Sequence, residues 1–182
     1  MTETAAQEDL RRQLEAMDRL RLQRVGVYGT PQRFILTHGI WYAPQPLPAG
    51  IRPGRPRCCF DNAIQLAVCR GVPYVEGYAL ALLPEGTIAL HHAWNLDAGA
   101  RVIDTTWPDA TTGGYLGVIF APERADEATW DGDATILEDD RRKYPLLRQP
   151  WHGEDPARVW PPSPRLDRLR RKGARHGTHT GA

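Results

Sequence analysis

The sequence contains the stretch CFDNAIQLAVCRG at residues 59–71, and VPYVEGYALALL follows directly at residues 72–83. The first stretch has the apolar spacing of a helix, with Cys59 in its first turn and Gly71 as the residue that ends it. The second is rich in β-branched, aromatic and aliphatic residues and predicts a strand over Tyr74–Leu83. A helix that opens on a cysteine and leads into a strand is the local pattern from which the remaining predictions extend.

Two further strands are predicted immediately downstream, and a fourth follows later. Turn signals at residues 84–86 and 97–99 separate these segments and favour antiparallel neighbours joined in a meander. The predicted strands after the first are Thr87–Leu96, Arg101–Thr106 and Tyr115–Phe120.

Upstream of the cysteine, the sequence predicts two helices and a loop. An amphipathic helix is expected from Ala5 to Val25, with an apolar face made of Leu10, Leu14, Met17 and Leu20 or Leu22. Thr30 and Pro31 are typical of a helix start, and Gly39 ends this second, short helix. Residues 43–57 contain five prolines and two glycines and are expected to form an extended loop that leads into Cys59.

The composition is that of an ordinary globular protein. The 182 residues are 41% hydrophobic and 25% charged, with a formal net charge of +1, so no global field points to a partner. We expect one domain over residues 1–160 and a disordered tail, rich in proline and arginine, over residues 161–182. The tail's basic run makes nucleic acid a conceivable partner, although a solvated tail is the usual role of such a run.

No segment has the length and apolar character of a membrane span or a signal peptide, so we expect a cytoplasmic protein without a membrane partner. The three cysteines, Cys58, Cys59 and Cys69, form an odd and clustered set. Adjacent cysteines are poorly placed to bridge each other, which argues against a disulfide framework. A reducing compartment would leave a thiol free to act as a nucleophile.

Cys59, His92 and Asp104 are the candidate catalytic residues. A thiol, an imidazole and a carboxylate on neighbouring elements can form a relay, in which the carboxylate orients the imidazole and the imidazole accepts the thiol proton. The turn at residues 97–99 brings Asp104 within reach of His92, and we expect Asp104 to hold the Nδ1 proton and leave Nε2 for the sulfur. In the first turn of a helix, Cys59 would meet unpaired backbone N–H groups that favour a thiolate and could bind an oxyanion.

Several neighbours have weaker assignments. Asn62, one turn after Cys59, could donate a hydrogen bond to the site or cap a loop. Glu76 is predicted to be a second-shell or substrate-facing carboxylate, or else to pair with an arginine. Trp94 shares a strand face with His92 and is expected to fix the ring and limit water, whereas His91 points to the opposite face.

The other two cysteines have different expectations. Cys69 is expected to lie in the core, as most lone helical cysteines do. Cys58 is either a bystander or the nucleophile itself, with the register displaced by one residue.

The segment from Cys59 to Trp107 resembles the transglutaminase-like superfamily of papain-like cysteine enzymes. The matching motifs are Cys59 with Ala63, Gly71-Val72-Pro73, Gly77-Tyr78, His92-Ala93-Trp94 and Asp104-Thr105-Thr106. The closer resemblance is to small bacterial and phage proteins with the motifs Cys-aromatic-x-Asn-Ala, Tyr-Val-Glu-Gly-Tyr, His-Ala-Trp and Ile-Asp-x-Thr-Trp. The chain departs from the wider family where it has Cys58 in place of a common glycine and Thr105 in place of a common proline.

The resemblance implies an α+β fold in which the cysteine helix packs on a small antiparallel sheet. It also implies Cys59 as nucleophile, His92 as base and Asp104 as the residue that orients the base. Proteins of this superfamily include transglutaminases, proteases, peptide N-glycanases and members without activity, so the resemblance leaves the substrate open.

The leading hypothesis is a cysteine-dependent acyl-transfer enzyme, an amide hydrolase or protease, that acts on a peptide or amide without a cofactor. One alternative is an acyltransferase similar to the arylamine N-acetyltransferases, and another is a binding module on a degenerate catalytic fold. A further alternative is a metal site. The cysteines and His91 and His92 are zinc-type ligands, but they lack the paired Cys-x-x-Cys spacing of structural zinc sites.

Overall fold

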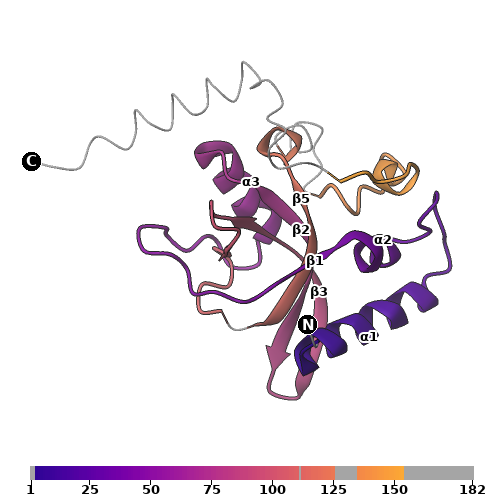
Figure 1. Ribbon diagram of the computed structural model, residues 1–182, viewed down its shortest axis with the longest axis horizontal. Coiled ribbons are helices and arrows are strands. Elements are labelled where there is room, and N and C mark those ends of the chain that lie inside the picture. The colour runs from indigo at the N-terminus through magenta and orange to yellow at the C-terminus, as the bar shows by residue number, and fades with distance from the viewer. Residues whose placement is uncertain (1–2, 111, 126–134, 154–182) are drawn as a thin grey trace, which may run out of the picture.

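The computed structural model describes residues 3–110, 112–125 and 135–153. Over these residues the fold is α+β, with helices packed on an antiparallel sheet (Figure 1). The sheet has the strand order β1-β5-β2-β3-β4. The helices are α1 (Ala5–Leu20), α2 (Pro31–His38) and α3 (Cys59–Arg70), and the strands are β1 (Ile40–Tyr42), β2 (Tyr74–Leu83), β3 (Gly86–Leu96), β4 (Val102–Ile103) and β5 (Thr112–Phe120).

The predicted meander is confirmed, because β2, β3 and β4 are consecutive antiparallel neighbours in the sheet. The third strand is much shorter than the predicted Arg101–Thr106, since only Val102 and Ile103 pair with β3. The fourth predicted strand, β5, lies on the other side of β2. The strand β1 was not predicted; its three residues pair with β5 and form that edge of the described sheet.

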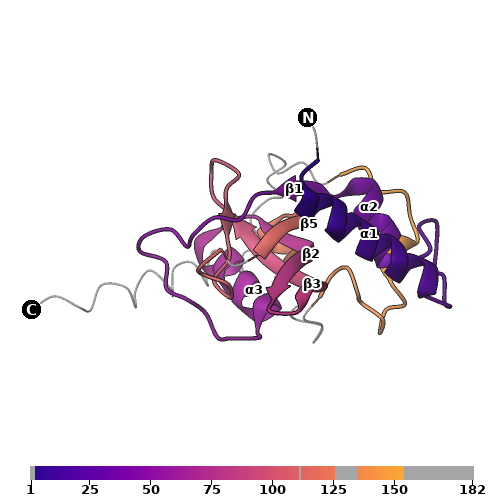
Figure 2. The same cartoon turned by 90° about the horizontal axis from the view of Figure 1, so that it is seen from below.

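All three helices contribute to one core on a single face of the sheet. Figure 2 shows α1 and α2 together at one end of the molecule and α3 at the other. This core joins residues of the three helices to the strand residues Tyr74, Tyr78, Leu116 and Phe120. The opposite face carries a smaller aromatic cluster around Trp94 and Tyr115. The cysteine helix therefore packs on the sheet, against β3 and β2.

The two N-terminal helices are set by their caps. Thr4 and Gln7 form the reciprocal hydrogen bonds of a capping box at the start of α1, and Thr30 caps α2 with Pro31 in its first position. The predicted range of α2 is confirmed. The predicted extension of α1 to Val25 is wrong, because the helix ends at Leu20.

The predicted apolar face of α1 is correct only in its first half. Leu10 and Leu14 are buried, whereas Leu20 is 79% and Leu22 is 100% exposed. In place of a longer helix, the chain turns back, and the buried Asp18 side chain binds Arg24 and Arg33 and accepts a hydrogen bond from Thr30. This cluster links the end of α1 to the start of α2.

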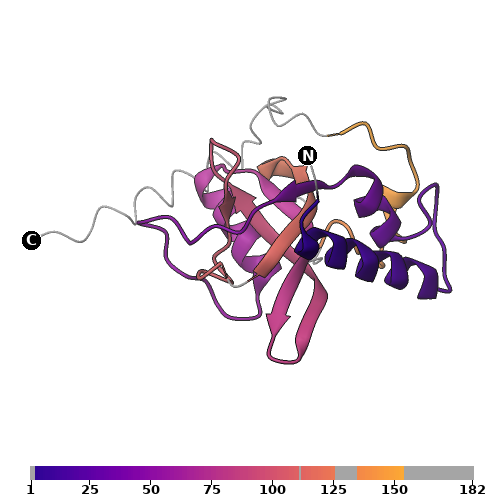
Figure 3. The same ribbon diagram turned by 60° about the horizontal axis from the view of Figure 1, so that its bottom comes forward.

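The β2–β3 hairpin extends beyond the rest of the molecule (Figure 3). Its outer part is held at one edge by α1, where the Gln13 side chain accepts a hydrogen bond from the Ala89 backbone N–H at 2.7 Å. Residues 135–147 return to the helical face of the sheet, where Ile136, Leu137 and Leu147 join the core. Pro145 begins the short 3-10 helix η1 (Pro145–Leu147). The predicted tail at residues 161–182 lies outside the described residues.

Replacing Phe34 with alanine should destabilise the fold strongly. Its side chain is fully buried and packs against the rings of Tyr28, His38 and Trp151. We expect a loss of about 3–5 kcal/mol in the free energy of unfolding, measured by urea denaturation. Leu22→Ala, at a fully exposed position, is the control and should change stability by less than about 0.5 kcal/mol. Equal effects of the two substitutions would contradict the core described above.

Candidate active site

The three predicted catalytic residues come from three different elements and lie together. Cys59 is the first residue of α3, His92 is in β3, and Asp104 directly follows β4. The Nε2 atom of His92 lies 2.7 Å from Oδ2 of Asp104, and Cys59 is close enough to the same ring to act as its hydrogen-bond partner. The chain thus brings a sulfur, an imidazole and a carboxylate together in that order.

The ring of His92 has the opposite orientation to the predicted one. We expected Asp104 to bind Nδ1, but it binds Nε2 and leaves Nδ1 as the nitrogen for Cys59. This ring orientation follows from the position of Asp104. Asp104 comes directly after Ile103, which pairs with β3, and it approaches the ring from the β4 side of the sheet. The relay is unaffected by this change, because either nitrogen of an imidazole can accept a proton while the other donates one.

The Asp104 carboxylate is buried and fully hydrogen-bonded. Its Oδ1 accepts the backbone N–H groups of Thr106 at 2.8 Å and Trp107 at 3.1 Å, and its Oδ2 accepts the Tyr115 hydroxyl at 2.9 Å in addition to His92. Burial acts to raise the pKa of Asp104, but these hydrogen bonds and the charge of His92 outweigh it and lower the pKa. The carboxylate is therefore held as an anion beside the imidazole.

His92 is only 2% exposed, and its pKa is raised. Burial of the ring lowers the pKa, but the hydrogen bonds to Asp104 and Cys59 and the charges of these groups raise it to about 9. The pKa of the neighbouring Tyr115 hydroxyl is also raised, because burial and the charge of Asp104 both disfavour its ionised form. Tyr115 therefore stays protonated and remains a hydrogen-bond donor to Asp104.

Aromatic rings enclose His92, although the predicted partner is not the nearest one. Trp107 stacks on the imidazole with the ring centroids 4.1 Å apart and the planes 11° from parallel, whereas the Trp94 centroid is 6.3 Å away. Trp94 is instead fully buried beneath the site, against Tyr115 and Tyr42. A Cβ added at Gly117 would lie 2.6 Å from the Trp94 ring, so this glycine allows the indole to lie against the sheet.

Asn62 holds the proline-rich loop beside the site. Its side chain accepts a hydrogen bond from the Arg55 backbone N–H at 3.1 Å and donates to the Arg55 carbonyl at 2.8 Å and to the Thr106 hydroxyl at 2.9 Å. Of the two predicted roles for Asn62, the structure shows the loop-capping one. The loop also donates the Gly54 N–H to the Thr105 carbonyl, so it forms a wall next to the segment that carries Asp104.

Glu76 lies on the other face of the sheet and does not line the site. Its buried carboxylate accepts hydrogen bonds from the backbone N–H groups of Ile136 and Leu137 and from the Tyr74 hydroxyl, and it pairs with His91 at 2.9 Å. The prediction of a substrate-facing carboxylate is therefore wrong, and His91 is a partner that the sequence did not indicate. Glu76 fastens residues 136–137 to the sheet.

The three cysteines differ in their surroundings. Cys58 precedes the helix as its N-cap residue without a side-chain hydrogen bond to it, and Cys59 rather than Cys58 interacts with His92. Cys69 is exposed, so the prediction of a core position is wrong. It lies in the last turn of α3. All three thiols are free.

The start of α3 leaves backbone donors available. Arg57 has φ of 62°, a left-handed conformation that turns the chain sharply into the helix. Because Cys58 makes no side-chain cap, the first-turn N–H groups near Cys59 keep their capacity to bind an anion. Within the described ranges, no group of three or more His, Cys, Asp or Glu side chains is arranged to hold a metal ion.

Comparisons of this chain with protein-family models, with curated proteins and with solved structures find no match. No helix in the part of the chain that the structure describes is both long enough and apolar enough to span a bilayer.

The raised pKa of His92 predicts a particular pH dependence of stability. The imidazole has an ordinary pKa of 6.5 and one of about 9 in the folded chain, so the folded state binds the proton more tightly. This stabilisation is fully present below about pH 6.5 and is lost as the pH rises through about 9. The free energy of unfolding, measured in urea at each pH, should therefore fall more steeply over this interval in the wild type than in His92→Asn. The exposed His152 provides the control, since His152→Asn should retain the wild-type slope.

Proposed function

We propose that this chain is a cysteine-dependent acyl-transfer enzyme that acts on amide or peptide bonds through a thioester intermediate. The observation that carries the proposal is the grouping of Cys59, in the first turn of α3, with the hydrogen-bonded pair of His92 and Asp104. The resemblance to the transglutaminase-like superfamily supports the same assignment, since its Cys, His and Asp motifs coincide with these three residues. The α+β arrangement, with the cysteine helix packed on an antiparallel sheet, is compatible with that family.

The reaction has a balanced set of steps. The thiol proton of Cys59 passes first to Nδ1 of His92, whose pKa of about 9 keeps the imidazole protonated near neutral pH. The sulfur then attacks the carbonyl carbon of the substrate as a thiolate. The carbonyl oxygen becomes an oxyanion that the backbone N–H groups in the first turn of α3 can bind. As the carbon–nitrogen bond breaks, His92 returns the proton to the leaving amine and a thioester remains on Cys59. A water molecule or a second amine then attacks the thioester, with His92 accepting the proton of the attacking group, and releases the thiol.

The surrounding residues have roles that follow from their contacts. Asp104 holds the Nε2 proton of His92 and stabilises the imidazolium that forms when Cys59 gives up its proton. Tyr115 and two backbone N–H groups keep Asp104 ionised and fixed in position. The stacked Trp107 covers one face of the imidazole, which restricts its rotation and its access to water. Asn62 fixes the loop that borders the site.

The reactivity of Cys59 should depend on His92, whereas that of Cys69 should not. In a timed reaction with iodoacetamide near neutral pH, His92→Asn should slow the modification of Cys59 by about tenfold or more, because the thiol loses its proton acceptor. The exposed Cys69 provides an internal control in the same sample and should react at an unchanged rate. Both rates can be followed by mass spectrometry of the digested protein. An unchanged rate at Cys59 would leave the relay without support.

Turnover can be tested with para-nitrophenyl acetate as a generic acyl donor. The proposal expects release of nitrophenolate and an acetyl group on Cys59, with both absent in Cys59→Ala. Labelling of Cys59 without any acyl transfer to it would favour the alternative of a binding module on a degenerate catalytic fold. Transfer of the acetyl group to an added aromatic amine in preference to water would favour an acyltransferase.

A further inference from the structure

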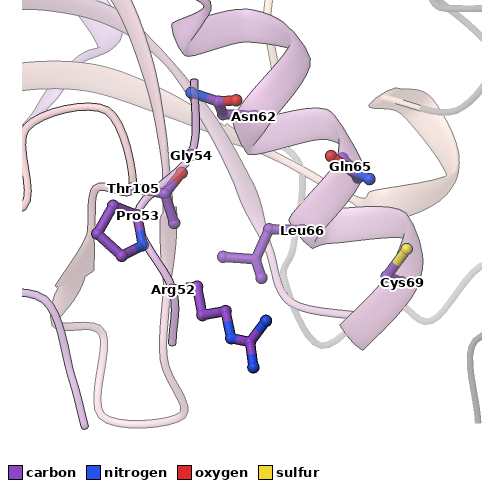
Figure 4. Close-up of a pocket in the computed structure, with 8 residues that line it drawn as sticks. All are labelled: Arg52, Pro53, Gly54, Asn62, Gln65, Leu66, Cys69 and Thr105. Carbon is purple, nitrogen blue, oxygen red and sulfur yellow. The ribbon is translucent and has the colours of Figure 1, made fainter. Parts of the chain in front are cut away.

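A pocket of about 250 Å³ lies on the outer side of α3, between this helix and the proline-rich loop (Figure 4). Leu66 points into its centre, and Pro53 lies opposite on the loop, so the middle of the pocket is apolar. Arg52, Gln65, Cys69 and Thr105 supply polar atoms around this apolar part. None of the residues of the proposed triad lines the pocket, although Thr105 directly follows Asp104.

The walls of this pocket are fixed by hydrogen bonds. The Gly54 N–H donates to the Thr105 carbonyl at 2.8 Å. The Asn62 side chain donates hydrogen bonds to Arg55 on the loop and to Thr106, so it links the two segments that flank α3. A Cβ at Gly54 would lie 2.5 Å from the Asn62 side chain, which shows how closely the loop approaches the helix. A pocket held in this way is already formed before a ligand binds, and little conformational entropy is lost on binding.

The electrostatics of the pocket favour an anion. Arg52 has no carboxylate partner among the residues that the structure describes, although neighbouring Arg55 is paired with Asp61 at 3.2 Å. No acidic side chain lines the pocket. An unpaired guanidinium is a preferred partner for a carboxylate, because its fork of N–H donors can bind both oxygens.

The size and the apolar centre restrict the ligand further. An enclosed cavity of roughly 150 Å³ can hold one benzene molecule, so a pocket of about 250 Å³ can hold one ring or branched chain together with a polar group. Leu66 is seven positions after Cys59 on the same helix, which corresponds to about 10 Å along the axis. The pocket extends from Leu66 to Asn62, one turn after Cys59, so this end of the pocket lies beside the proposed acyl-transfer centre.

We propose that this pocket binds a small organic carboxylate with an apolar ring or branched body. The carboxylate pairs with Arg52, the apolar body packs on Leu66 and Pro53, and Gln65 and the Thr105 hydroxyl provide hydrogen bonds. The site is additional to the proposed acyl-transfer centre and does not depend on the chemistry of Cys59. Because Thr105 is adjacent to Asp104, an occupied pocket also contacts the segment that carries the carboxylate of the triad.

The proposal can be tested on the full chain with benzoate as the probe and benzamide as its neutral counterpart. Two-dimensional amide NMR should show saturable shifts at Gln65, Leu66 and Thr105 with benzoate, with a Kd on the order of 1 mM. Benzamide, which lacks the charge, should bind at least about fivefold more weakly. Saturating benzoate should also slow the alkylation of Cys69, because this thiol is at the rim of the pocket.

Matched variants separate the pocket from general charge effects. Arg52→Gln should weaken benzoate binding to the level of benzamide, whereas Arg19→Gln, at an exposed site on α1, should leave it unchanged. The proposal is overturned if benzoate causes no saturable shift at these amides, if benzamide binds equally well, or if Arg52→Gln has no effect. The outcome is independent of the acyl-transfer reaction, and Cys59→Ala should bind benzoate as the wild type does.

Discussion

The hydrogen bond between His92 and the buried carboxylate of Asp104 is the interaction on which the proposed site depends. A buried carboxylate is costly unless its oxygen atoms are satisfied. Here two backbone N–H groups, one tyrosine hydroxyl and one imidazole satisfy them. The same bond orients the ring, raises its pKa and directs its other nitrogen toward Cys59. Cys59 can transfer its proton to His92 only because Asp104 already holds the ring in this orientation.

The two faces of the sheet contribute differently to the site of His92 and Asp104. The helical face contains the main core, with α3 packed against β3 and β2, and this packing places the first turn of α3 beside the edge of β3. The opposite face contains the aromatic cluster of Trp94, Tyr115 and Trp107 around the imidazole. Adjacent residues on β3 serve the two faces, since His91 pairs with Glu76 on one and His92 with Asp104 on the other.

The sequence was informative where structure is local. Strand alternation gave the range of β2 and nearly that of β3, and the caps at Thr30 and Gly71 gave the limits of two helices. The order of Cys59, His92 and Asp104 predicted residues that the fold does bring together. Prediction from the sequence failed where the contacts join residues far apart in the chain. Tyr115 reaches Asp104 only because β5 lies beside β2, and nothing within the Tyr115 segment signals this pairing.

Other failures have equally physical causes. Two of the hydrogen-bond donors to Glu76 come from residues 136–137, about sixty positions away, so the local pattern could not indicate them. The strand β1 is too short to give a periodic signal. The helical period could not show on which side of α3 Cys69 would lie, because both sides of that last turn carry mixed residues. The imidazole orientation depends on the approach of Asp104 from β4, which a sequence cannot specify.

Nitrogen NMR of isotopically labelled histidine tests the arrangement of His92 most directly. The structure predicts that Nε2 keeps its proton throughout the titration, that Nδ1 is the nitrogen that titrates with a midpoint at about pH 9, and that Cys59→Ala lowers this midpoint. A midpoint near the ordinary value of 6.5, or a Nδ1 signal that does not respond to Cys59→Ala, would contradict the contact between the sulfur and the ring.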